Sequence, residues 1–391
     1  MKELLHETFG IMVYQEDVIK VCCRYAGLDL ADADILRRGM SGKYRQKSKE
    51  FDRLTRRFFT GAAALGHDAT ITKEVWRQIS SFAGFSFSKA HSASFAVESY
   101  QSLYLKTYFP KEFMVAVLNN YGGFYRRWVY IQELRKTGVN VHLPCVNHSD
   151  DVVNIRENEV YLGFIAIQGL ENRFIMQIPQ ERKRNGKYTG MENLIKRVQL
   201  TLDQLLILIR VGAMRFTGKT KKELLWEAHA CLGHHPKPSA HASLFQLPAK
   251  AFQLPGFETD SLEDAYQEME LLGYTVSMPE YELLKTTYRG DIAAGELDKM
   301  GGKIVKTVGN LVAEKTVYTR SNTKMWFGTF IDAGGAFFDT VHFPGPHPVY
   351  PFRGRGCYLI LGKVTLDFGV PSIEVMKFAK LPMKTNPALS M

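Results

Sequence analysis

Apolar residues recur at helical spacing through the first third of the chain. In residues 14–28 the segment YQEDVIKVCCRYAGL places Val18, Val21, Cys22 and Tyr25 on one side of a helix, and Gly27 follows as a C-cap. The pattern therefore predicts a helix here that packs one face against a core.

Further helices are predicted over KSKEFDRLTRRFFTGAAALG, TITKEVWRQISSFAG and SASFAVESYQSLYLKTYFP. Thr70 or Thr72 is the expected cap of the second, because Glu74 follows within four residues, in a pattern like that of a capping box. The third is so rich in apolar residues that we expect it to be buried, with Pro110 ending it. A break in the helical pattern is expected at Gly39 and Gly42.

The pattern changes twice in the rest of the chain. Residues 136–165 mix short β-branched runs with turn residues, which predicts a small hairpin-bearing connector before helices return up to about Ala230. A proline-rich stretch, HHPKPSAHASLFQLPAKAFQLPGF, then indicates a linker. From about Lys303, five β-rich runs separated by Gly, Asn and Pro turns predict a small barrel such as an OB-fold, although a sandwich would give a similar pattern. The fold class is thus multidomain α+β.

Composition narrows the kind of partner. The 391 residues carry a net charge of +10, and the isoelectric point is about 9.2. This charge favours an anionic partner, either nucleic acid or a membrane surface. No apolar run is long enough to cross a membrane, so nucleic acid is favoured. The five cysteines are scattered and odd in number, which indicates a reducing, cytoplasmic location.

A basic cluster from Arg37 to Arg57 opens with LRRGMSGK. Glycine allows close backbone approach to an anion, and the guanidinium groups of Arg37 and Arg38 match phosphate oxygens, with Lys43 nearby. The alternative is a solvated helix face.

Lys89 and His91 lie in SFSKAHS, just before a predicted helix start. Because helix N-termini favour anions, both side chains could reach a polyphosphate. The alternative, a solvated Lys89 and a partly buried His91, is equally consistent with the local pattern.

Three other groups are poor candidates for chemistry. The histidines of HACLGHH lack a further ligand at zinc-finger spacing. Asp29, Asp32 and Asp34 precede or cap a helix and lack the flanking β-strand that would suggest a metal site. Cys22 and Cys23 fall within an apolar helix, so no nucleophile is indicated.

Taken together, these motifs resemble the fingers region of the bacterial C-family DNA polymerases, the DNA polymerase III α subunits. The resemblance rests on ETFGIMVYQEDVIKV, ADADILRRGMSGK and FAGFSFSKAHSASFAVESYQSLYLKTYFPKEFM, in that order. YLGFIAIQGLEN and LLILIRVGAMRF resemble the family's tandem helix–hairpin–helix module, and KIVKTVGNLVAEK onward is similar to its OB domain. The residues of YQEDVIKV and LRRGMSGK resemble the DnaE-like branch of the family more than its PolC branch.

The resemblance implies five parts. They are a fingers domain (1–135), a connector with the helix–hairpin–helix module (136–232), a proline-rich linker (233–260), a helical connector (261–300) and an OB-fold-like domain (301–391). The family's palm domain, which binds two metal ions, and its phosphoesterase-like domain have no counterpart here. We therefore expect Mg to be bound by the palm-containing part and not by this chain, and we expect the chain alone to bind DNA without polymerising.

The resemblance also implies site residues. Arg37, Arg38, Lys43, Lys89 and His91 would face the triphosphate of the incoming dNTP or the primer–template. Gly163, Gly169 and Gly212 would let backbone amides meet DNA phosphates. Among the barrel aromatics Trp326, Phe327, Phe337 and Phe338, Trp326 is the first candidate for stacking on single-stranded template, although a place in the barrel core is favoured for at least half of the four.

Two further implications concern partners and role. Ser243, Leu244 and Phe245 of the linker partly match the family's clamp-binding peptide, although His241 replaces the expected Gln, so the sliding clamp is a candidate partner beside the palm-containing part. A plain linker is the alternative. For the chain as a whole, the alternative to a polymerase portion is a non-catalytic DNA-binding accessory protein derived from the polymerase.

Overall fold

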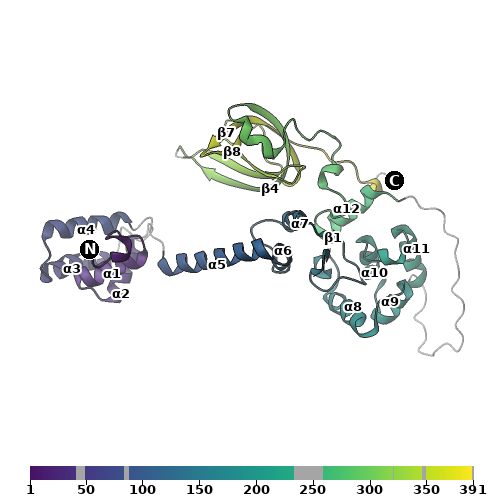
Figure 1. Ribbon diagram of the computed structural model, residues 1–391, viewed down its shortest axis with the longest axis horizontal. Coiled ribbons are helices and arrows are strands. Elements are labelled where there is room, and N and C mark those ends of the chain that lie inside the picture. Colours follow the sequence, from purple (N-terminus) through teal and green to yellow (C-terminus); the bar gives the residue numbers. More distant parts are fainter. Residues whose placement is uncertain (41–48, 83–87, 233–258, 320, 346–348, 390–391) are drawn as a thin grey trace. The chain divides into compact units, whose positions relative to one another are not determined.

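The computed structural model describes residues 1–40, 49–82, 88–232, 259–319, 321–345 and 349–389. These residues form two compact units, Met1–Tyr108 and Phe109–Met391. Figure 1 shows that the first unit is helical, whereas the second combines helices with two sheets. The sequence-based division into five parts stays a prediction.

The described residues of the first unit form one short 3-10 helix and five α-helices. They are η1 (His6–Thr8), α1 (Gln15–Ala26), α2 (Leu30–Met40), α3 (Lys49–Ala64), α4 (Ala69–Phe82) and α5 (Lys89–Tyr108). The predicted face of α1 is confirmed, because Val18, Val21, Cys22 and Tyr25 are all buried. These side chains pack with Leu36, Leu54, Phe58 and Ile79 of the next three helices into one apolar cluster.

Two glycines explain how α1 fits against its neighbours. Gly27 ends α1 in the left-handed conformation, with φ of 67°, and its amide bonds back to the carbonyls of Cys22 and Cys23. A Cβ atom on Gly61 would lie 1.9 Å from the carbonyl oxygen of Ala26. Only glycine therefore allows α3 to pass this close to the end of α1.

Two predictions about this unit were wrong, and a third differs by one residue. Helix α2 continues through Gly39 but ends at Met40, and Gly42 lies outside the described residues. The cap of α4 is Asp68, whose Oδ1 accepts hydrogen bonds from the amides of Thr70 and Ile71, and not Thr70 or Thr72. No residue of α5 is buried, although a buried helix was expected from its apolar sequence.

The second unit begins with a helical body. Its helices are α6 (Pro110–Asn119), α7 (Arg127–Lys136), η2 (Phe164–Ala166), α8 (Asn172–Asn185), α9 (Met191–Val198), α10 (Leu202–Arg210), η3 (Arg215–Thr217), α11 (Lys221–Leu232) and α12 (Ser261–Leu272). They enclose a single apolar cluster in which Leu162, Phe164, Leu194, Leu205 and Leu208 are fully buried.

A three-stranded sheet completes this body, with order β1–β3–β2. Strands β2 (Asn154–Arg156) and β3 (Glu159–Tyr161) form the predicted hairpin, and β1 (Asn140–His142) pairs with β3 in parallel. The central residue of each strand, Val141, Ile155 or Val160, packs against the helical core. Because side chains alternate along a strand, the flanking residues lie on the opposite face.

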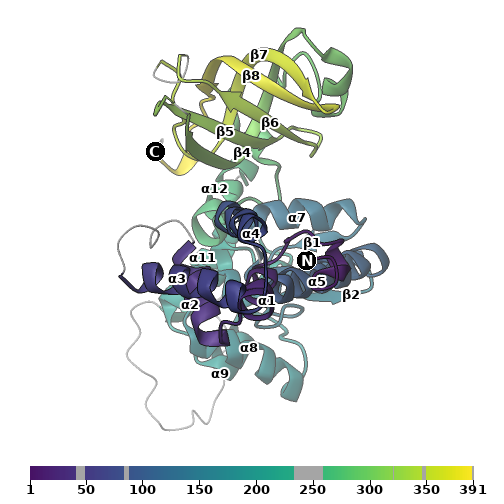
Figure 2. The same cartoon turned by 90° about the vertical axis from the view of Figure 1, so that its left-hand side faces the viewer.

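The remaining strands form a closed five-stranded barrel. Its strands are β4 (Ile304–Tyr318), β5 (Lys324–Ile331), β6 (Phe337–His342), β7 (Cys357–Asp367) and β8 (Val370–Lys380). The order is β4–β5–β6–β8–β7, and β4 and β7 close the ring (Figure 2). Strands β6 and β8 are parallel and the other pairs are antiparallel. The predicted small barrel of OB type is confirmed.

Short 3-10 turns join the barrel to the helical body: η4 (Glu280–Leu283) and η5 (Ala294–Met300), with η6 (Pro387–Leu389) after the last strand. The hydroxyl of Tyr281 donates to the carbonyl of Ile331 at 2.5 Å and accepts from the amide of Asn310 at 2.9 Å. Val129 of α7 packs against Val312 and Ile331 of the barrel. The barrel is therefore anchored to the helices by both polar and apolar contacts.

Candidate nucleotide and nucleic-acid interface

The start of α1 organises the basic side chains of the first unit. Tyr14 is the N-cap of α1, and Gln15 and Glu16 are its first two residues. Gln15 accepts a hydrogen bond from Arg37 of α2 at 2.5 Å. Glu16 accepts from the hydroxyl of Ser88 at 2.6 Å and from the amide of Lys89 at 2.8 Å. Two neighbouring residues thus hold Arg37 and the beginning of α5.

Glu16 caps the N-terminus of α5. Burial raises the pKa of its carboxyl, but the hydrogen bonds from the Lys89 amide and the Ser88 hydroxyl outweigh burial, so the pKa lies below the ordinary 4.5. A carboxylate thus occupies the position at this helix end that was considered for a phosphate. Sequence reasoning missed this contact, because Glu16 and Lys89 lie 73 positions apart.

Lys89 has a second acidic neighbour. Its ammonium group forms an ion pair with Glu7, and it lies 5.8 Å from the centre of the Tyr14 ring. The hydrogen bond from Lys89 lowers the pKa of Glu7, and the same bond raises the pKa of Lys89. Lys89 is exposed, so this pair is a surface contact that a stronger anion can displace.

The other predicted nucleotide contacts are less closely grouped. Arg37 also pairs with Asp34 at 2.8 Å, and Arg38 pairs with the same carboxylate at 2.9 Å. His91 lies exposed in the first turn of α5, with its ring edge-on to Phe95 at 4.4 Å. The structure therefore brings Arg37 and Lys89 to the start of α1, with Arg38 beside Arg37. Lys43 lies outside the described residues.

In the second unit, Gly169 forms a hairpin before α8. It has φ of 80°, and within the described part of the chain neither its amide nor that of Leu170 makes a hydrogen bond. The buried side chain of Gln204 holds this hairpin: its Oε1 accepts from the Glu171 amide at 2.8 Å and its Nε2 donates to the Gly169 carbonyl at 3.1 Å. Sequence reasoning missed Gln204, although a glutamine within the apolar run LDQLLILIR was a usable signal.

Gly212 and Gly163 have different surroundings. The Gly212 amide already bonds to the Ile209 carbonyl at 2.9 Å, and its own carbonyl accepts from Arg215 at 2.6 Å. Gly163 is buried, and a Cβ atom there would lie 2.3 Å from the backbone carbon of Val152. Both glycines are buried and thus permit close packing, whereas Gly169 is exposed and its amide makes no hydrogen bond within the described residues.

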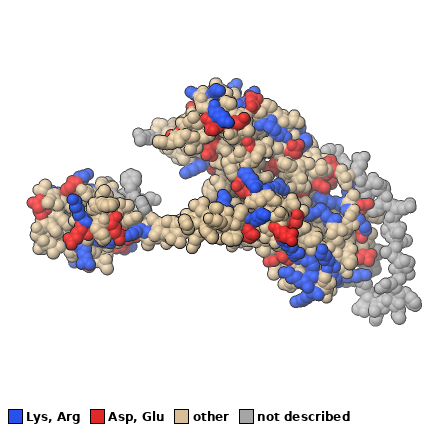
Figure 3. Space-filling model, viewed as in Figure 1, with Lys and Arg blue, Asp and Glu red and all other residues tan. Residues whose placement is uncertain are grey.

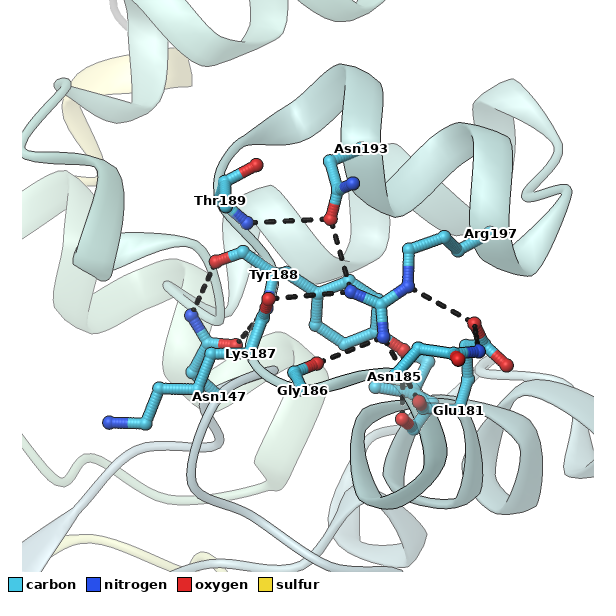
Figure 4. Close-up of polar contacts among 10 residues, drawn as sticks. Asn147, Glu181, Asn185, Gly186, Lys187, Tyr188, Thr189, Asn193 and Arg197 are labelled. Carbon is cyan, nitrogen blue, oxygen red and sulfur yellow. Dashed lines mark hydrogen bonds and ion pairs between the residues drawn. The ribbon is translucent and has the colours of Figure 1, made fainter.

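Arg197 fixes the turn between α8 and α9. Figure 4 shows its guanidinium surrounded by acceptors: the Glu181 carboxylate at 3.1 Å and the carbonyls of Glu181 and Gly186 at 3.0 and 2.9 Å. It also lies 4.3 Å from the centre of the Tyr188 ring. This arginine therefore holds the turn between α8 and α9 together through its hydrogen bonds.

Exposed basic residues gather around this turn. Figure 3 shows lysine and arginine side chains over the part of the second unit that carries α8 and α9. The exposed ones in this stretch are Arg173, Lys183, Arg184, Lys187 and Lys196. Together with the open hairpin at Gly169, they form a surface suited to a phosphate backbone.

The barrel aromatics divide between core and surface. Phe338 is 5% exposed and packs in the barrel core with Phe330. Phe327 and Phe337 are each 41% exposed, and Lys136 lies over the Phe337 ring. Trp326 is partly buried and pairs across the sheet with His342 and Thr316. Of these four rings, Phe327 and Phe337 thus lie at the surface, and Lys136 lies over one face of Phe337.

The described residues do not fit a magnesium site. They contain no group of three or more His, Cys, Asp or Glu side chains placed to hold a metal ion. Asp29 caps α2 by accepting from the Asp32 amide, and Asp32 and Asp34 pair with arginines. Among these same residues no helix is long and apolar enough to cross a membrane. Ser243, Leu244 and Phe245 lie outside the described residues.

Two protein-family models match the chain. Residues 1–66 match the bacterial DNA polymerase III alpha subunit finger domain, and residues 138–224 match a helix-hairpin-helix motif. The second match covers both the Gly169 hairpin and the Gly212 turn. A structural comparison finds the second OB-fold domain of replication protein A from Methanococcus maripaludis, with 13% identity, 22% of this chain and 91% of that chain covered, and a TM-score of 0.17, which is too low to support an argument.

Curated relatives cover most of the chain. The DNA polymerase III subunit alpha of Treponema pallidum is 31% identical over 88% of this chain, and that of Borreliella burgdorferi is 30% identical over 97%. An error-prone DNA polymerase of Mycobacterium tuberculosis is 32% identical over 60%. The chain spans 30% and 35% of the length of the first two relatives. The chain therefore belongs to the bacterial DNA polymerase III α subunit family and corresponds to a DnaE-like C-terminal portion, with a finger region, a helix–hairpin–helix module and a small barrel.

Proposed function

We propose that this chain binds the triphosphate of an incoming dNTP and the primer–template DNA, as part of a DNA-directed DNA polymerase that acts in replication or repair synthesis. The observation that carries the proposal is the meeting of Arg37 and Lys89 at Gln15 and Glu16. Arg37 lies within the finger-domain match, residues 1–66, whereas Lys89 lies beyond its end. Their geometry supports a phosphate site between α2 and the start of α5, with Arg38 and His91 as further contacts and Lys43 as a candidate.

The second unit would hold the DNA. The open amides at Gly169 and the basic side chains near α8 and α9 support contact with the phosphate backbone, without reading of sequence. Gly163 and Gly212 would act by shaping this module. Trp326 and the exposed barrel rings are the proposed contacts of single-stranded template.

Catalysis would need a separate palm-containing part. We propose that this part supplies the Mg ions, because the described residues of this chain offer no fitting set of ligands. The purified chain alone is then expected to give no primer extension, and measurable extension would contradict this. The cytoplasm is the proposed compartment, since all five cysteines are free thiols.

Direct titration of a fluorescent dNTP tests the phosphate site. We expect Lys89→Ala and Arg37→Ala to weaken binding about 10- to 150-fold, as for the loss of a charge-assisted contact worth about 1.5–3 kcal/mol. Lys73→Ala, which removes an exposed lysine of α4, is the matched control and should bind as wild type does. Equal binding by all four proteins would exclude this site.

One observation favours the non-catalytic accessory function. Glu7 and Glu16 already occupy the ammonium group of Lys89 and the first amide of α5. A protein that uses these contacts only to hold its fold would bind DNA but show no response to nucleotide. The dNTP titration separates the two functions.

The sliding clamp remains a proposed partner through Ser243, Leu244 and Phe245. A pull-down with a bacterial clamp should succeed with the wild type and fail with the Leu244→Ala, Phe245→Ala double variant. Absence of binding by the wild type would remove this partner.

A further inference from the structure

The outer face of the three-stranded sheet carries an unusual set of side chains. Strand pairing places His142 of β1 directly beside Tyr161 of β3, and Asn154 of β2 on the other side of Tyr161. Two residues away on the same face, Glu159 lies beside Arg156 and Asn140. A sheet that needed only a solvated outer face would not require aromatic rings here.

Three rings on this face form what we call the ring stack: His142, Tyr161 and His148. The Tyr161 ring lies 4.7 Å from His142 and 4.9 Å from His148, with interplanar angles of 20° and 21°. Each imidazole therefore has one side against Tyr161 and its second side turned away. All three residues are partly exposed.

The ring stack is held firmly by its neighbours. Asn154 donates to the His148 carbonyl at 2.9 Å, and the Cys145 thiol lies 3.4 Å from His148 Nδ1. His142 Nε2 is paired with Glu159, which also accepts from Asn140 at 2.8 Å. A rigid set of rings loses little freedom when another flat ring stacks on it.

Cations flank the ring stack. Arg156 is exposed on the same sheet face, and Lys187 is exposed in the turn after α8. Burial lowers the pKa of His148, and the nearby charges of Lys187, Arg156 and Arg182 lower it further. The lowered pKa favours the neutral form of the His148 ring at pH 7. Arg182 is buried and paired with Asp150, so it is not available to a ligand.

We propose that this face binds single-stranded DNA, with one base extending the ring stack and the adjacent phosphates held by Arg156 and Lys187. Flat rings beside exposed cations match the two chemical features of a nucleotide, its base and its phosphate. This site is distinct from the Gly169 hairpin, which offers backbone amides and no rings. The proposal rests on the proposed DNA binding of the same module, which it extends from a phosphate contact to a base contact.

The test is equilibrium binding of a fluorescein-labelled 12-nucleotide oligo-dT to the full chain. Arg156→Ala and Lys187→Ala should each weaken binding several-fold and lower the salt slope by about 1. Tyr161→Leu removes the ring against which both imidazoles are stacked, so the outer rings lose their support. This change should weaken binding by up to about 5- to 150-fold, since base–aromatic stacking contributes about 1–3 kcal/mol. Tyr161→Phe, which keeps the ring, and Lys73→Ala, a matched exposed lysine of the first unit, should bind as wild type does.

Because Tyr161→Leu could weaken binding by disturbing the fold, the test also includes measurements on proteins that keep the ring. An oligonucleotide that contains 2-aminopurine should lose fluorescence on binding to the wild type and to Tyr161→Phe, because stacking quenches this base. Arg156→Ala should keep the thermal midpoint of the wild type, which shows that its weaker binding does not come from unfolding. Wild-type affinity and salt slope in Arg156→Ala, Lys187→Ala and Tyr161→Leu together would overturn the proposal while DNA binding by the module stands. Absence of DNA binding by the wild type would overturn both.

Discussion

Two neighbouring residues at the start of α1, Gln15 and Glu16, hold separate parts of the first unit. The Glu16 carboxylate caps α5 through Ser88 and Lys89, while the neighbouring Gln15 holds Arg37. The YQE sequence, Tyr14 to Glu16, is thus a structural centre of the first unit. The sequence could not show this, because the partners lie 22 and 73 positions away and leave no local pattern.

Glu16 predicts a pH dependence of stability. Its pKa is lowered in the folded protein, so its contribution to folding is fully present above the ordinary value near 4.5 and is lost as the pH falls through the lowered value. We expect Glu16→Gln to lower the thermal midpoint at pH 6, with the difference from wild type shrinking between pH 5 and pH 3. Glu98→Gln, an exposed residue of α5, is the control. A difference that stays constant over this range would contradict the cap.

Gln204 is the residue whose replacement should affect the hairpin most specifically. Gln204→Ala leaves the Glu171 amide and the Gly169 carbonyl without their partner, which should cost about 1–3 kcal/mol of unfolding free energy. Urea denaturation measures this loss, and Gln78→Ala, an exposed glutamine of α4, should cost less than about 0.5 kcal/mol. Equal stability of both variants would mean that Gln204 does not hold the hairpin.

At the scale of elements, the spacing of apolar residues predicted individual helices and strands but not what covers them. The buried face of α1 and the five barrel strands follow from spacing that depends only on the chain itself. The burial of α5 could not be predicted in this way, because apolar content does not show whether anything covers the helix. Its Phe95, Tyr100, Leu103 and Tyr108 are each at least half exposed, and Figure 3 shows this helix almost without charge.

The exposure of α5 has a measurable consequence. Tyr100 and Leu103 are 73% and 63% exposed, so the double change to lysine should alter the unfolding free energy by less than about 0.5 kcal/mol. Binding of a dye that reports apolar surface should fall in the same variant. Leu36→Ala, in the core of the first unit, should instead cost about 2–5 kcal/mol. A comparable loss from the α5 variant would show that this helix is covered in solution.

At the scale of the whole molecule, the family resemblance predicted more of the structure than the chemistry of single motifs did. The finger, helix–hairpin–helix and barrel regions were all predicted in the right order, because their motifs are long and specific. The site was predicted only in outline. Arg37 and Lys89 do meet at one place, but their carboxylate partners, Gln204 and the ring stack depend on contacts between segments far apart in sequence.

A net charge of +10 and two separate groups of basic residues lead to the central claim, that the chain binds DNA and nucleotide together. The most direct test is the affinity of the full chain for a primer–template over a range of salt, with and without the complementary dNTP. We expect the logarithm of the association constant to fall linearly with the logarithm of the salt concentration. The dNTP should tighten binding several-fold in the wild type but not in Lys89→Ala. Unchanged affinity on adding dNTP to the wild type, or binding that salt does not weaken, would contradict the claim.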